Sequence, residues 1–323
     1  MSKAAICAVV PVYKAMATLD RCVESVLAQQ VEGGLTCILV DDGSPDESGT
    51  LCDAWAAKDD RVTVIHQDDL GVSGARNSGL AAADSEFIVF LDSDDALRPG
   101  ALQAALTAQR AAPQDFVVWH YTTDEKDPAA VTADAEPRTQ AGLARLWLDC
   151  LLAMPWNKLY RADLAKQLQF DVQYTLGEDL QFVLDYIALL GQTVPEFGYR
   201  VMTSPLTFYD CSRGGTLSTR YHANYCDIWP KHFAKLNAAC HAAACPAEDM
   251  RPLHRAELQV FAEGVADIMR RDPSPTQRLK GYKAEAALRS PWLRALLERM
   301  KIEHCYSAYY LPCRWRNVGL VCR

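Results

Sequence analysis

The sequence contains no long hydrophobic run. A membrane-spanning helix needs about 20 consecutive, mostly apolar residues, whereas the apolar run near the N-terminus covers only residues 4–10. A secretory signal peptide also needs a longer apolar stretch, followed by a small-residue cleavage site. We therefore expect a cytoplasmic protein that has neither a membrane span nor a secretion signal.

Paired cysteines are also missing. None of the 12 cysteines belongs to a Cys-x-x-Cys pair, and Cys7 and Cys37 lie in apolar runs where a small core side chain is expected. Cys240, His241 and Cys245 are of the types that bind zinc, but no further ligands follow at a matching spacing. We therefore interpret these three residues as part of a packed helix.

Basic charge is scarce over most of the chain. The sequence has 33 Lys and Arg against 41 Asp and Glu, a net charge of −8. Because non-specific affinity for nucleic acids comes from a basic surface, no nucleic-acid partner is expected. The exception is the C-terminal segment of residues 270–323, in which twelve basic residues face only four carboxylates.

The basic tail, residues 288–323, combines these charges with a predicted helical face of Leu288, Trp292, Leu296 and Met300. Basic residues beside an apolar face suit a peripheral contact with the inner surface of a membrane. A helix packed on the catalytic domain, with a solvated basic side, has the same pattern. Both alternatives remain open from the sequence.

The first hundred residues alternate between strand and helix patterns. Continuous apolar runs predict buried strands at residues 4–10, 36–40, 62–66 and 87–91. Amphipathic or glycine-started segments predict helices at residues 19–27, 47–58 and 71–82. This order predicts an α/β fold with a doubly wound, mainly parallel sheet, in which ligands bind at the carboxyl ends of the strands.

The rest of the chain is less regular. Residues 124–138 are rich in Pro, Ala and charge and predict a loop, while residues 147–160 and 177–190 suggest helical or turn-bearing segments. Beyond Gly214 and Gly215 the pattern predicts helices alone, at residues 225–244, 253–270 and 292–302.

The segment Asp92-Ser93-Asp94-Asp95 directly follows a predicted strand. Three carboxylates within four residues repel one another unless a cation or solvent compensates them. Mg²⁺ and Mn²⁺ prefer such oxygen ligands and commonly bridge carboxylates to substrate phosphates. A solvated acidic turn that caps the next helix explains the same segment equally well.

Two further motifs are ambiguous in the same way. Asp42, at another predicted strand end, can accept the imide N–H of a uracil ring, but its Asp-Gly-Ser-Pro context is also ordinary turn chemistry. Arg76 follows a glycine-containing turn and can pair with a phosphate or with a carboxylate of a metal site. An exposed arginine in the first turns of a helix is the alternative. His66 is interpreted as a strand-end histidine rather than a catalyst.

Five motifs occur in the order found in one family. They are VVPVY (residues 9–13), RCVESVL (21–27), VDDGSPD (40–46), GVSGARN (71–77) and FLDSDD (90–95). Together they resemble the inverting family 2 glycosyltransferases of bacterial polysaccharide synthesis, which have the GT-A fold. The resemblance continues through WNKLYR (156–161) and LGEDLQF (176–182) and fades beyond residue 218.

The resemblance implies a GT-A-type sheet with a C-terminal helical extension. Its catalytic domain would cover residues 1–218, with a nucleotide-sugar-binding half (1–110) and an acceptor-binding half (111–218), and the helical region would cover 219–323. Asp92 and Asp94 would be ligands of Mn²⁺ or Mg²⁺. The implied donor-binding residues are Pro11, Val12, Tyr13, Asp42, Arg76, Asp92, Ser93 and Arg213.

The resemblance also implies the catalytic pair. Asp179 matches the family's base, and Glu178 would orient the loop or the acceptor. The pair could equally begin a helix near its positive end, which is compatible with catalysis. Two departures from the family pattern are Lys14, where asparagine is usual, and Asp68-Asp69-Leu70, where Glu-Asn-Gly is typical. Neither departure removes a group that the chemistry needs.

The expected function is therefore transfer of a sugar from a nucleotide-diphosphate donor, UDP-linked, to the hydroxyl of a glycan or lipid-linked glycan. Such an inverting reaction needs one base to deprotonate the attacking hydroxyl. Two other classes are weighed against it. A sugar nucleotidyltransferase usually has a glycine- and basic-rich triphosphate loop, which is absent around residues 11–14. An inactive glycan- or nucleotide-sugar-binding protein would not need the carboxylates at positions 92, 94 and 179.

Overall fold

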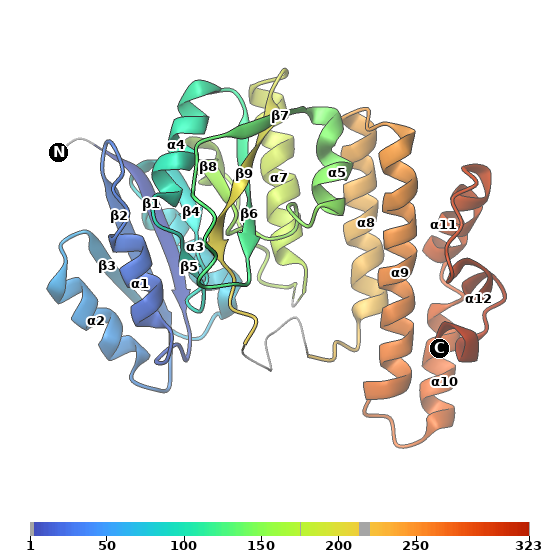
Figure 1. Ribbon diagram of the computed structural model, residues 1–323. Helices are drawn as coiled ribbons and strands as arrows, with labels where there is room; N and C mark the ends of the chain where they lie inside the picture. Colours follow the sequence, from blue (N-terminus) through green and yellow to red (C-terminus); the bar gives the residue numbers. More distant parts are fainter. Residues whose placement is uncertain (1–2, 175, 213–219, 323) are drawn as a thin grey trace. The chain divides into compact units, whose positions relative to one another are not determined.

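The computed structural model describes residues 3–174, 176–212 and 220–322 (Figure 1). Contacts group the chain into two compact units. The first, which we call the sheet unit, contains residues 1–140 and 151–213, and the second, the helical unit, contains residues 141–150 and 214–323. The catalytic domain boundary at residue 218 and the division at residue 110 stay predictions.

The sheet unit is built on one nine-stranded sheet with the order β3-β2-β1-β4-β8-β6-β9-β5, and β7 pairs with β9. Neighbouring strands among β1 to β4 pair in parallel, as do β6 and β9, whereas β5, β7 and β8 run antiparallel to their neighbours. The predicted mainly parallel α/β sheet is confirmed. The strands are β1 (Ala4–Val12), β2 (Leu35–Asp42), β3 (Val62–Gln67), β4 (Ser85–Phe90), β5 (Ala96–Leu97), β6 (Phe116–Thr122), β7 (Ala135–Thr139), β8 (Lys158–Arg161) and β9 (Gly198–Phe208).

Helices cover both faces of this sheet. The helices predicted at residues 19–27 and 71–82 have those bounds in the structure, and the helix predicted at 47–58 begins one residue later. Among the described residues, the helices of this unit are α1 (Leu19–Leu27), α2 (Ser48–Lys58), α3 (Gly71–Ala82), α4 (Ala101–Ala111), α6 (Ala162–Ala165) and α7 (Glu178–Thr193).

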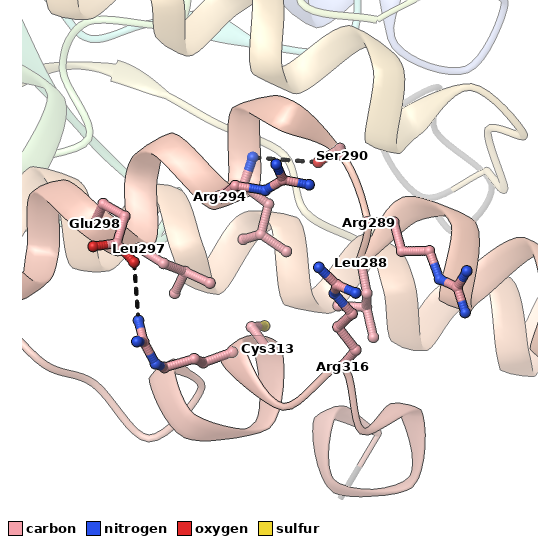
Figure 2. Close-up of a pocket in the computed structure, with 10 residues that line it drawn as sticks. Leu288, Arg289, Ser290, Arg294, Leu297, Glu298, Cys313 and Arg316 are labelled. Atoms are coloured by element: carbon pink, nitrogen blue, oxygen red, sulfur yellow. Dashed lines mark hydrogen bonds and ion pairs between the residues drawn. The ribbon is translucent and has the colours of Figure 1, made fainter.

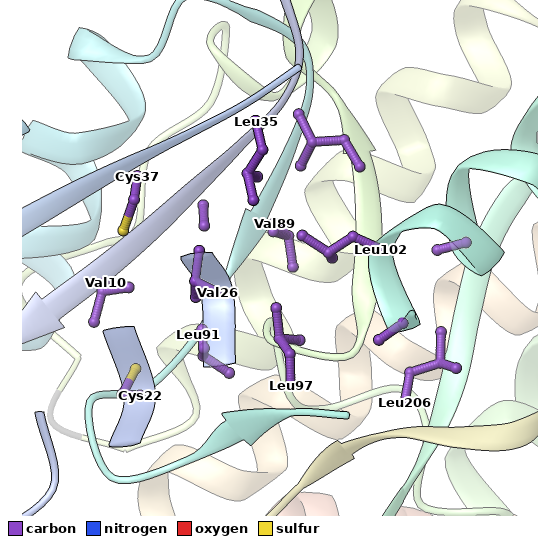
Figure 3. Close-up of a cluster of buried hydrophobic side chains, with 14 of the residues drawn as sticks. Val10, Cys22, Val26, Leu35, Cys37, Val89, Leu91, Leu97, Leu102 and Leu206 are labelled. Carbon is purple, nitrogen blue, oxygen red and sulfur yellow. The ribbon is translucent and has the colours of Figure 1, made fainter. Parts of the chain in front are cut away.

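The two faces have separate cores. On one face, alternate residues of the strands pack against α1, α2 and α4, and Figure 3 shows Val10 and Val89 of the strands near Val26 of α1 and Leu102 of α4. Helix α3 lies on the other face, because a Cβ at Gly79 would collide with Val9 of β1. Cys7 and Cys37 are fully buried, which agrees with their interpretation as core side chains.

Two predictions for the sheet unit need correction. The segment 124–138 is not entirely a loop, because residues 135–139 form β7 against β9. The segment 147–160 is not one helical or turn-bearing element. Its first residues end helix α5 (Leu143–Leu148), and its last residues begin β8, which pairs with the buried strands β4 and β6.

The helical unit confirms the predicted C-terminal helical region. Its core is formed by apolar residues of α9, α10 and α11 with the last turns of the chain. None of the helices in the described part of the chain is long and apolar enough to cross a membrane. Besides α5, the described helices are α8 (Tyr225–Ala242), α9 (Ala247–Arg271), α10 (Gln277–Ala287), α11 (Pro291–Ile302), α12 (Tyr310–Arg314) and α13 (Val318–Val321).

The apolar face predicted in the basic tail is used inside this unit. Leu288, Leu296 and Met300 are buried in its core, and Trp292 packs against Phe261 with ring centroids 5.2 Å apart. This face is therefore packed, but within the helical unit, whereas the packed alternative expected the catalytic domain as its partner. Cys240 is buried in α8 while His241 is exposed, so they do not share a side as zinc ligands would.

Candidate active site

The ends of three parallel strands define the candidate active site. Val12 of β1 pairs with Asp41 of β2, and β4 pairs with β1 in parallel, so the carboxyl ends of all three strands lie at one edge of the sheet. Pro11 and Val12 are buried in β1, whereas the Tyr13 that follows them is 44% exposed. The chain therefore emerges from the core at the edge where a ligand is expected.

Asp42 organises the loop that leads into α3. Its Oδ1 accepts hydrogen bonds from Gln67 Nε2 at 2.7 Å and from the Leu70 backbone N–H at 3.0 Å. Asp41, not Asp42, serves the local turn, because its Oδ1 accepts from the Ser44 backbone N–H. Among the described residues, Asp42 Oδ2 forms no hydrogen bond. Asp42 therefore keeps one carboxylate oxygen for another donor.

His66 bridges two carboxylates beside this loop. Its Nδ1 lies 3.0 Å from Asp41 Oδ2 and its Nε2 lies 2.9 Å from Asp53 Oδ1. Hydrogen bonds to Asp53 and Asp41 raise the pKa of His66. These contacts join β3 to β2 and α2, as expected for a strand-end histidine with a structural role.

Arg76 joins three acidic residues from separate parts of the chain. Its guanidinium contacts Asp179 Oδ1 at 2.5 Å and Asp92 Oδ1 at 2.8 Å, and Glu178 Oε1 lies 3.8 Å away. The Arg76 side chain is only 3% exposed, and its guanidinium lies 5.4 Å from the centroid of the Phe170 ring. The exposed-arginine alternative is therefore wrong, and Arg76 holds a carboxylate of the acidic strand end, as one interpretation expected.

The acidic partners of Arg76 remain partly open to solvent. The side chains of Asp92, Asp179 and Glu178 are 30%, 28% and 12% exposed. Glu178 and Asp179 are the first residues of α7, where the helix dipole favours negative charge. Gly177 precedes them with φ of 77°, a left-handed conformation that favours glycine. Burial raises the pKa of Asp179, and the Arg76 guanidinium opposes this shift.

The rest of the acidic segment is more deeply placed. Asp95 is fully buried, and its Oδ1 accepts the Asp210 backbone N–H at 2.9 Å, while its buried Oδ2 has no hydrogen-bond partner among the described residues. Burial, together with Asp92 and Asp94, raises the pKa of Asp95 to about 8. Ser93 and Asp94, which lie between Asp92 and Asp95 in the sequence, are half-buried. Carboxyl groups are therefore concentrated at the end of β4.

Comparison with known families accounts for this arrangement. Residues 7–169 match the family described as glycosyl transferase family 2. The chain belongs to that family. The matched region contains the strand ends, the loop before α3, Arg76 and the acidic segment, and it ends before the Glu178–Asp179 pair.

The curated relatives of this family 2 chain are named as glycosyltransferases or as proteins of succinoglycan or teichoic acid biosynthesis. The chain is 38% identical over 121 residues to glycosyltransferase GlyG of Streptococcus pneumoniae serotype 4, covering 37% of this chain and 40% of GlyG. It is 31% identical over 211 residues to the succinoglycan biosynthesis protein ExoO of Rhizobium meliloti, covering 59% of this chain and 58% of ExoO. The chain thus spans about half the length of the relatives it matches.

Solved structures establish the GT-A-type fold. The crystal structure of S. aureus TarS residues 1–349 in complex with UDP-GlcNAc matches with a TM-score of 0.63 and 16% identity, covering 98% of this chain and 89% of that one. The mannosyltransferase PcManGT of Pyrobaculum calidifontis, in complex with GDP-Man and Mn²⁺, matches with a TM-score of 0.54 and 16% identity, over 98% and 87% of the two chains.

Two residues of the WNKLYR motif are structural. Lys158 is fully buried, and its Nζ donates to the carbonyl oxygens of Leu151 (2.7 Å) and Met154 (2.5 Å) and to Asn157 Oδ1 (2.5 Å). Burial lowers the pKa of Lys158 well below its ordinary value. Trp156 is 3% exposed and stacks on Tyr209. Lys158 is therefore neither a surface lysine nor free to reach a ligand.

Sequence reasoning missed the Arg21–Asp210 pair. Arg21 Nη2 lies 2.6 Å from Asp210 Oδ2 and 2.6 Å from the carbonyl oxygen of Asp94, so it ties the segment after β9 to the acidic segment. The pKa of Asp210 falls to about 2 because of its hydrogen bonds to Arg21 and Ser212. The position of Arg21 in a family motif was the one sequence signal that could have pointed to its role. Arg213, three residues after Asp210, lies outside the described residues.

The Lys14 departure has a backbone consequence. Lys14 has φ of 53°, in the left-handed region, and its N–H donates to Ser44 Oγ at 3.2 Å. Asparagine adopts this conformation more readily than lysine does, which explains why a family 2 chain would favour asparagine there. Lys14 also extends over the Tyr13 ring, with Nζ 5.0 Å from its centroid.

Proposed function

We propose that this family 2 chain is an inverting glycosyltransferase. It moves a sugar from a nucleotide-diphosphate donor, UDP-linked, to a hydroxyl of a glycan or lipid-linked glycan in the cytoplasm, in polysaccharide or glycoconjugate synthesis. The observation that carries the proposal is the Arg76 guanidinium, which joins the acidic end of β4 to the first turn of α7. The names of GlyG and ExoO and the UDP-GlcNAc bound by TarS support the same class of reaction.

Asp179 is the proposed base. In inversion, the acceptor oxygen forms a bond to the anomeric carbon as the bond from that carbon to the nucleotide diphosphate breaks, and the hydroxyl proton passes to a carboxylate. Asp179 is partly exposed, is oriented by its 2.5 Å contact with Arg76 and has a raised pKa, so it accepts a proton more readily than an ordinary aspartate. Glu178, beside it, orients the loop or the acceptor.

The donor nucleoside is proposed to lie at the ends of β1 and β2. Pro11, Val12 and Tyr13 would frame the nucleoside, with the exposed Tyr13 ring as its apolar side, and Asp42 would accept the imide N–H of uracil. The contacts of Asp42 fit this role, because Oδ1 already orders the loop before α3 while Oδ2 forms no hydrogen bond among the described residues. Ser93, at the end of β4, and Arg213 complete the proposed donor site.

The acidic segment fits a hard divalent ion. Asp92, Asp94 and Asp95 gather carboxylate oxygens, and the buried Asp95 Oδ2 has no partner in the described part of the chain. We propose that Asp92 and Asp94 hold Mn²⁺ or Mg²⁺, with Asp94 as the direct ligand. When bound, the ion would neutralise the developing charge of the diphosphate. Arg76 would keep Asp92 oriented toward that ion.

Donor binding and turnover test this function. Wild-type protein is screened by thermal shift against UDP- and GDP-sugars with Mn²⁺ and, separately, with a chelator. A nucleotide sugar at about 100 times its Kd contributes about 2.7 kcal/mol and raises the melting temperature. Asp94→Asn should lose the Mn²⁺-dependent part of this shift. Asp84→Asn, which alters a carboxylate that is 87% exposed, should keep it.

The same samples separate the alternatives. Release of the free nucleotide from the stabilising donor in the presence of Mn²⁺ is the expected result. Binding without any release would identify an inactive nucleotide-sugar-binding protein. Formation of pyrophosphate from a nucleoside triphosphate and a sugar phosphate would identify a nucleotidyltransferase. No stabilisation by any nucleotide sugar, with no release, would overturn the proposal.

A further inference from the structure

The helical unit contains a groove lined by four arginines. Its volume is about 240 Å³, and it lies beside α11 and the turn after α12 (Figure 2). This is smaller than the roughly 300–1,000 Å³ typical of sites for drug-sized ligands, and it suits a compact group such as a phosphate. The lining residues are Leu288, Arg289, Ser290, Leu293, Arg294, Leu297, Glu298, Cys313, Arg314 and Arg316.

The groove is basic on its walls and apolar on its floor. Leu288, Leu293, Leu297 and Cys313 are all buried, with 1–6% of each exposed. The lining contains four arginines and a single carboxylate, that of Glu298. Guanidinium groups bind phosphate oxygens through paired, charge-assisted hydrogen bonds. The combination of a charged rim and an apolar floor favours an amphiphile that carries a phosphate.

Two of the four arginines have no carboxylate partner in the part of the chain that the structure describes. Arg314 lies 3.1 Å from Glu298, and Arg289 lies 3.6 Å from Glu285. Within residues 220–322, Arg294 and Arg316 form no ion pair, and both are exposed. In Figure 2 their side chains extend into the space between α11 and the segment that follows α12. The groove therefore has two guanidinium groups available for an anion.

Arg316 occupies a position where glycine is the favoured residue. Its φ is 52°, and it follows α12, with its N–H donating to the Cys313 carbonyl oxygen and the Asn317 N–H donating to that of Pro312. Helices commonly end with glycine in this left-handed conformation. A guanidinium is thus placed at the groove at a backbone cost, and glycine can replace Arg316 without strain.

Exposed apolar side chains flank the groove residues in the chain. Trp315, between Arg314 and Arg316, is 64% exposed, and Leu311 is 48% exposed. Tryptophan is enriched at the membrane–water interface. We propose that the arginine groove binds the phosphate of an anionic phospholipid at a membrane surface. This proposal does not depend on sugar transfer.

Vesicle binding by the full chain tests the proposal. Flotation is compared between vesicles of phosphatidylcholine alone and vesicles that also contain phosphatidylglycerol. The chain carries a net charge of −8, so binding to the anionic vesicles requires a local basic site. The double variant Arg294→Gln and Arg316→Gly should weaken this binding about thirtyfold, about fivefold for each arginine. Arg251→Gln with Arg278→Gln, the same loss of charge outside the groove, should leave it unchanged.

Each other outcome overturns the proposal. Equal loss in both double variants would mean that overall charge, not the groove, drives binding. Binding of inorganic phosphate in the groove, without any binding of vesicles, would identify a site for free phosphate. No binding of wild-type protein to either vesicle would exclude a lipid site. Asp179→Asn should bind vesicles as wild type does, which separates this result from the proposed transfer reaction.

Discussion

Two polar networks, one in each unit, differ in how much of them is open to solvent. In the sheet unit, the buried guanidinium of Arg76 contacts carboxylates that keep 12–30% of their side-chain surface exposed. In the helical unit, Asn237 Nδ2 donates to Glu257 Oε1 at 2.6 Å, and His254 lies 3.1 Å from Asn237 Oδ1 and 2.7 Å from Glu303 Oε2. In this second network, the polar side chains form hydrogen bonds mainly with one another, between packed helices.

The difference separates a binding network from a packing network. Around Arg76 there is more negative than positive charge, and the surplus lies at a rim that a cation or ligand can reach. Around His254, Glu257 is 1% exposed, and burial raises its pKa to about 8, so it is mainly neutral at pH 7. Buried polar groups of this kind can specify how helices align. The following changes should act differently on the two networks.

The largest effect is expected for Asp179→Asn. Loss of the base should reduce sugar transfer about 10²–10⁴-fold, while the amide retains a contact with Arg76 and leaves the melting temperature near that of wild type. Steady-state kinetics and thermal unfolding measure the two effects. Asp171→Asn, on the exposed segment before α7, is the control. Near-wild-type turnover of Asp179→Asn would refute the assignment of the base.

Arg76→Met should strongly destabilise the sheet unit. The variant leaves three carboxylates without their cation, and removal of one partner of a buried ion pair costs about 3 kcal/mol or more. Arg299→Met in the helical unit is the comparison, because Arg299 Nη1 donates to the neutral Asn237 Oδ1 at 3.2 Å. Its cost should be nearer 1 kcal/mol. If both variants lost the same unfolding free energy, measured by urea unfolding, the distinction between the two networks would be contradicted.

Substitution of one glycine in each unit tests how closely the helix packs there. Gly79→Ala should cost about 1–3 kcal/mol, because the new methyl would collide with Val9 under α3. Gly281→Ala in α10 meets nothing within 4 Å and should stabilise by about 0.5–1 kcal/mol. Chemical unfolding of both variants checks the signs. A stabilising Gly79→Ala would show that α3 does not press on β1.

A further effect concerns the pH dependence of the helical unit. Glu257 is protonated in the folded state up to about pH 8, whereas in the unfolded chain it ionises near its ordinary pKa of 4.5. The folded state therefore binds the extra proton between these values, and Glu257 makes stability fall as pH rises through this window. Glu257→Gln should remove that decline and be more stable than wild type at pH 8 by at least about 1 kcal/mol. Unfolding free energies at pH 5 and pH 8 decide. The exposed Glu263→Gln should reproduce the wild-type slope.

Strongly patterned elements could be predicted from the sequence. Apolar runs bounded by turns located β1 to β4, and three-and-four spacing located α1, because burial of one face determines these patterns. The strand β8 and the edge strand β7 were not predicted, since each is short and depends on pairing with residues distant in sequence. The division of the chain at residues 141–150 has no local signal either.

The candidate site was predictable in its parts but not in its contacts. The family motifs identified Asp92 and Asp179, but the ion pairs through Arg76 depend on how α3 is rotated against the sheet. A clue existed, because Gly79 lies one helical turn after Arg76 and only a glycine fits where α3 meets Val9. The burial of Lys158 had no such clue, since its carbonyl partners come from an irregular segment.

The short helix α5 links the two units in an unusual order. Leaving the sheet unit after residue 140, the chain contributes residues 141–150 to the helical unit and then returns for residues 151–213. There, Trp147 lies 5.6 Å from Phe233 and Leu143 and Leu146 are buried. If the C-terminal helices were exchanged between relatives during evolution, these apolar side chains would lose their packing partners and become exposed to solvent. We therefore expect residues 141–150 to be inherited together with the region that begins at residue 214.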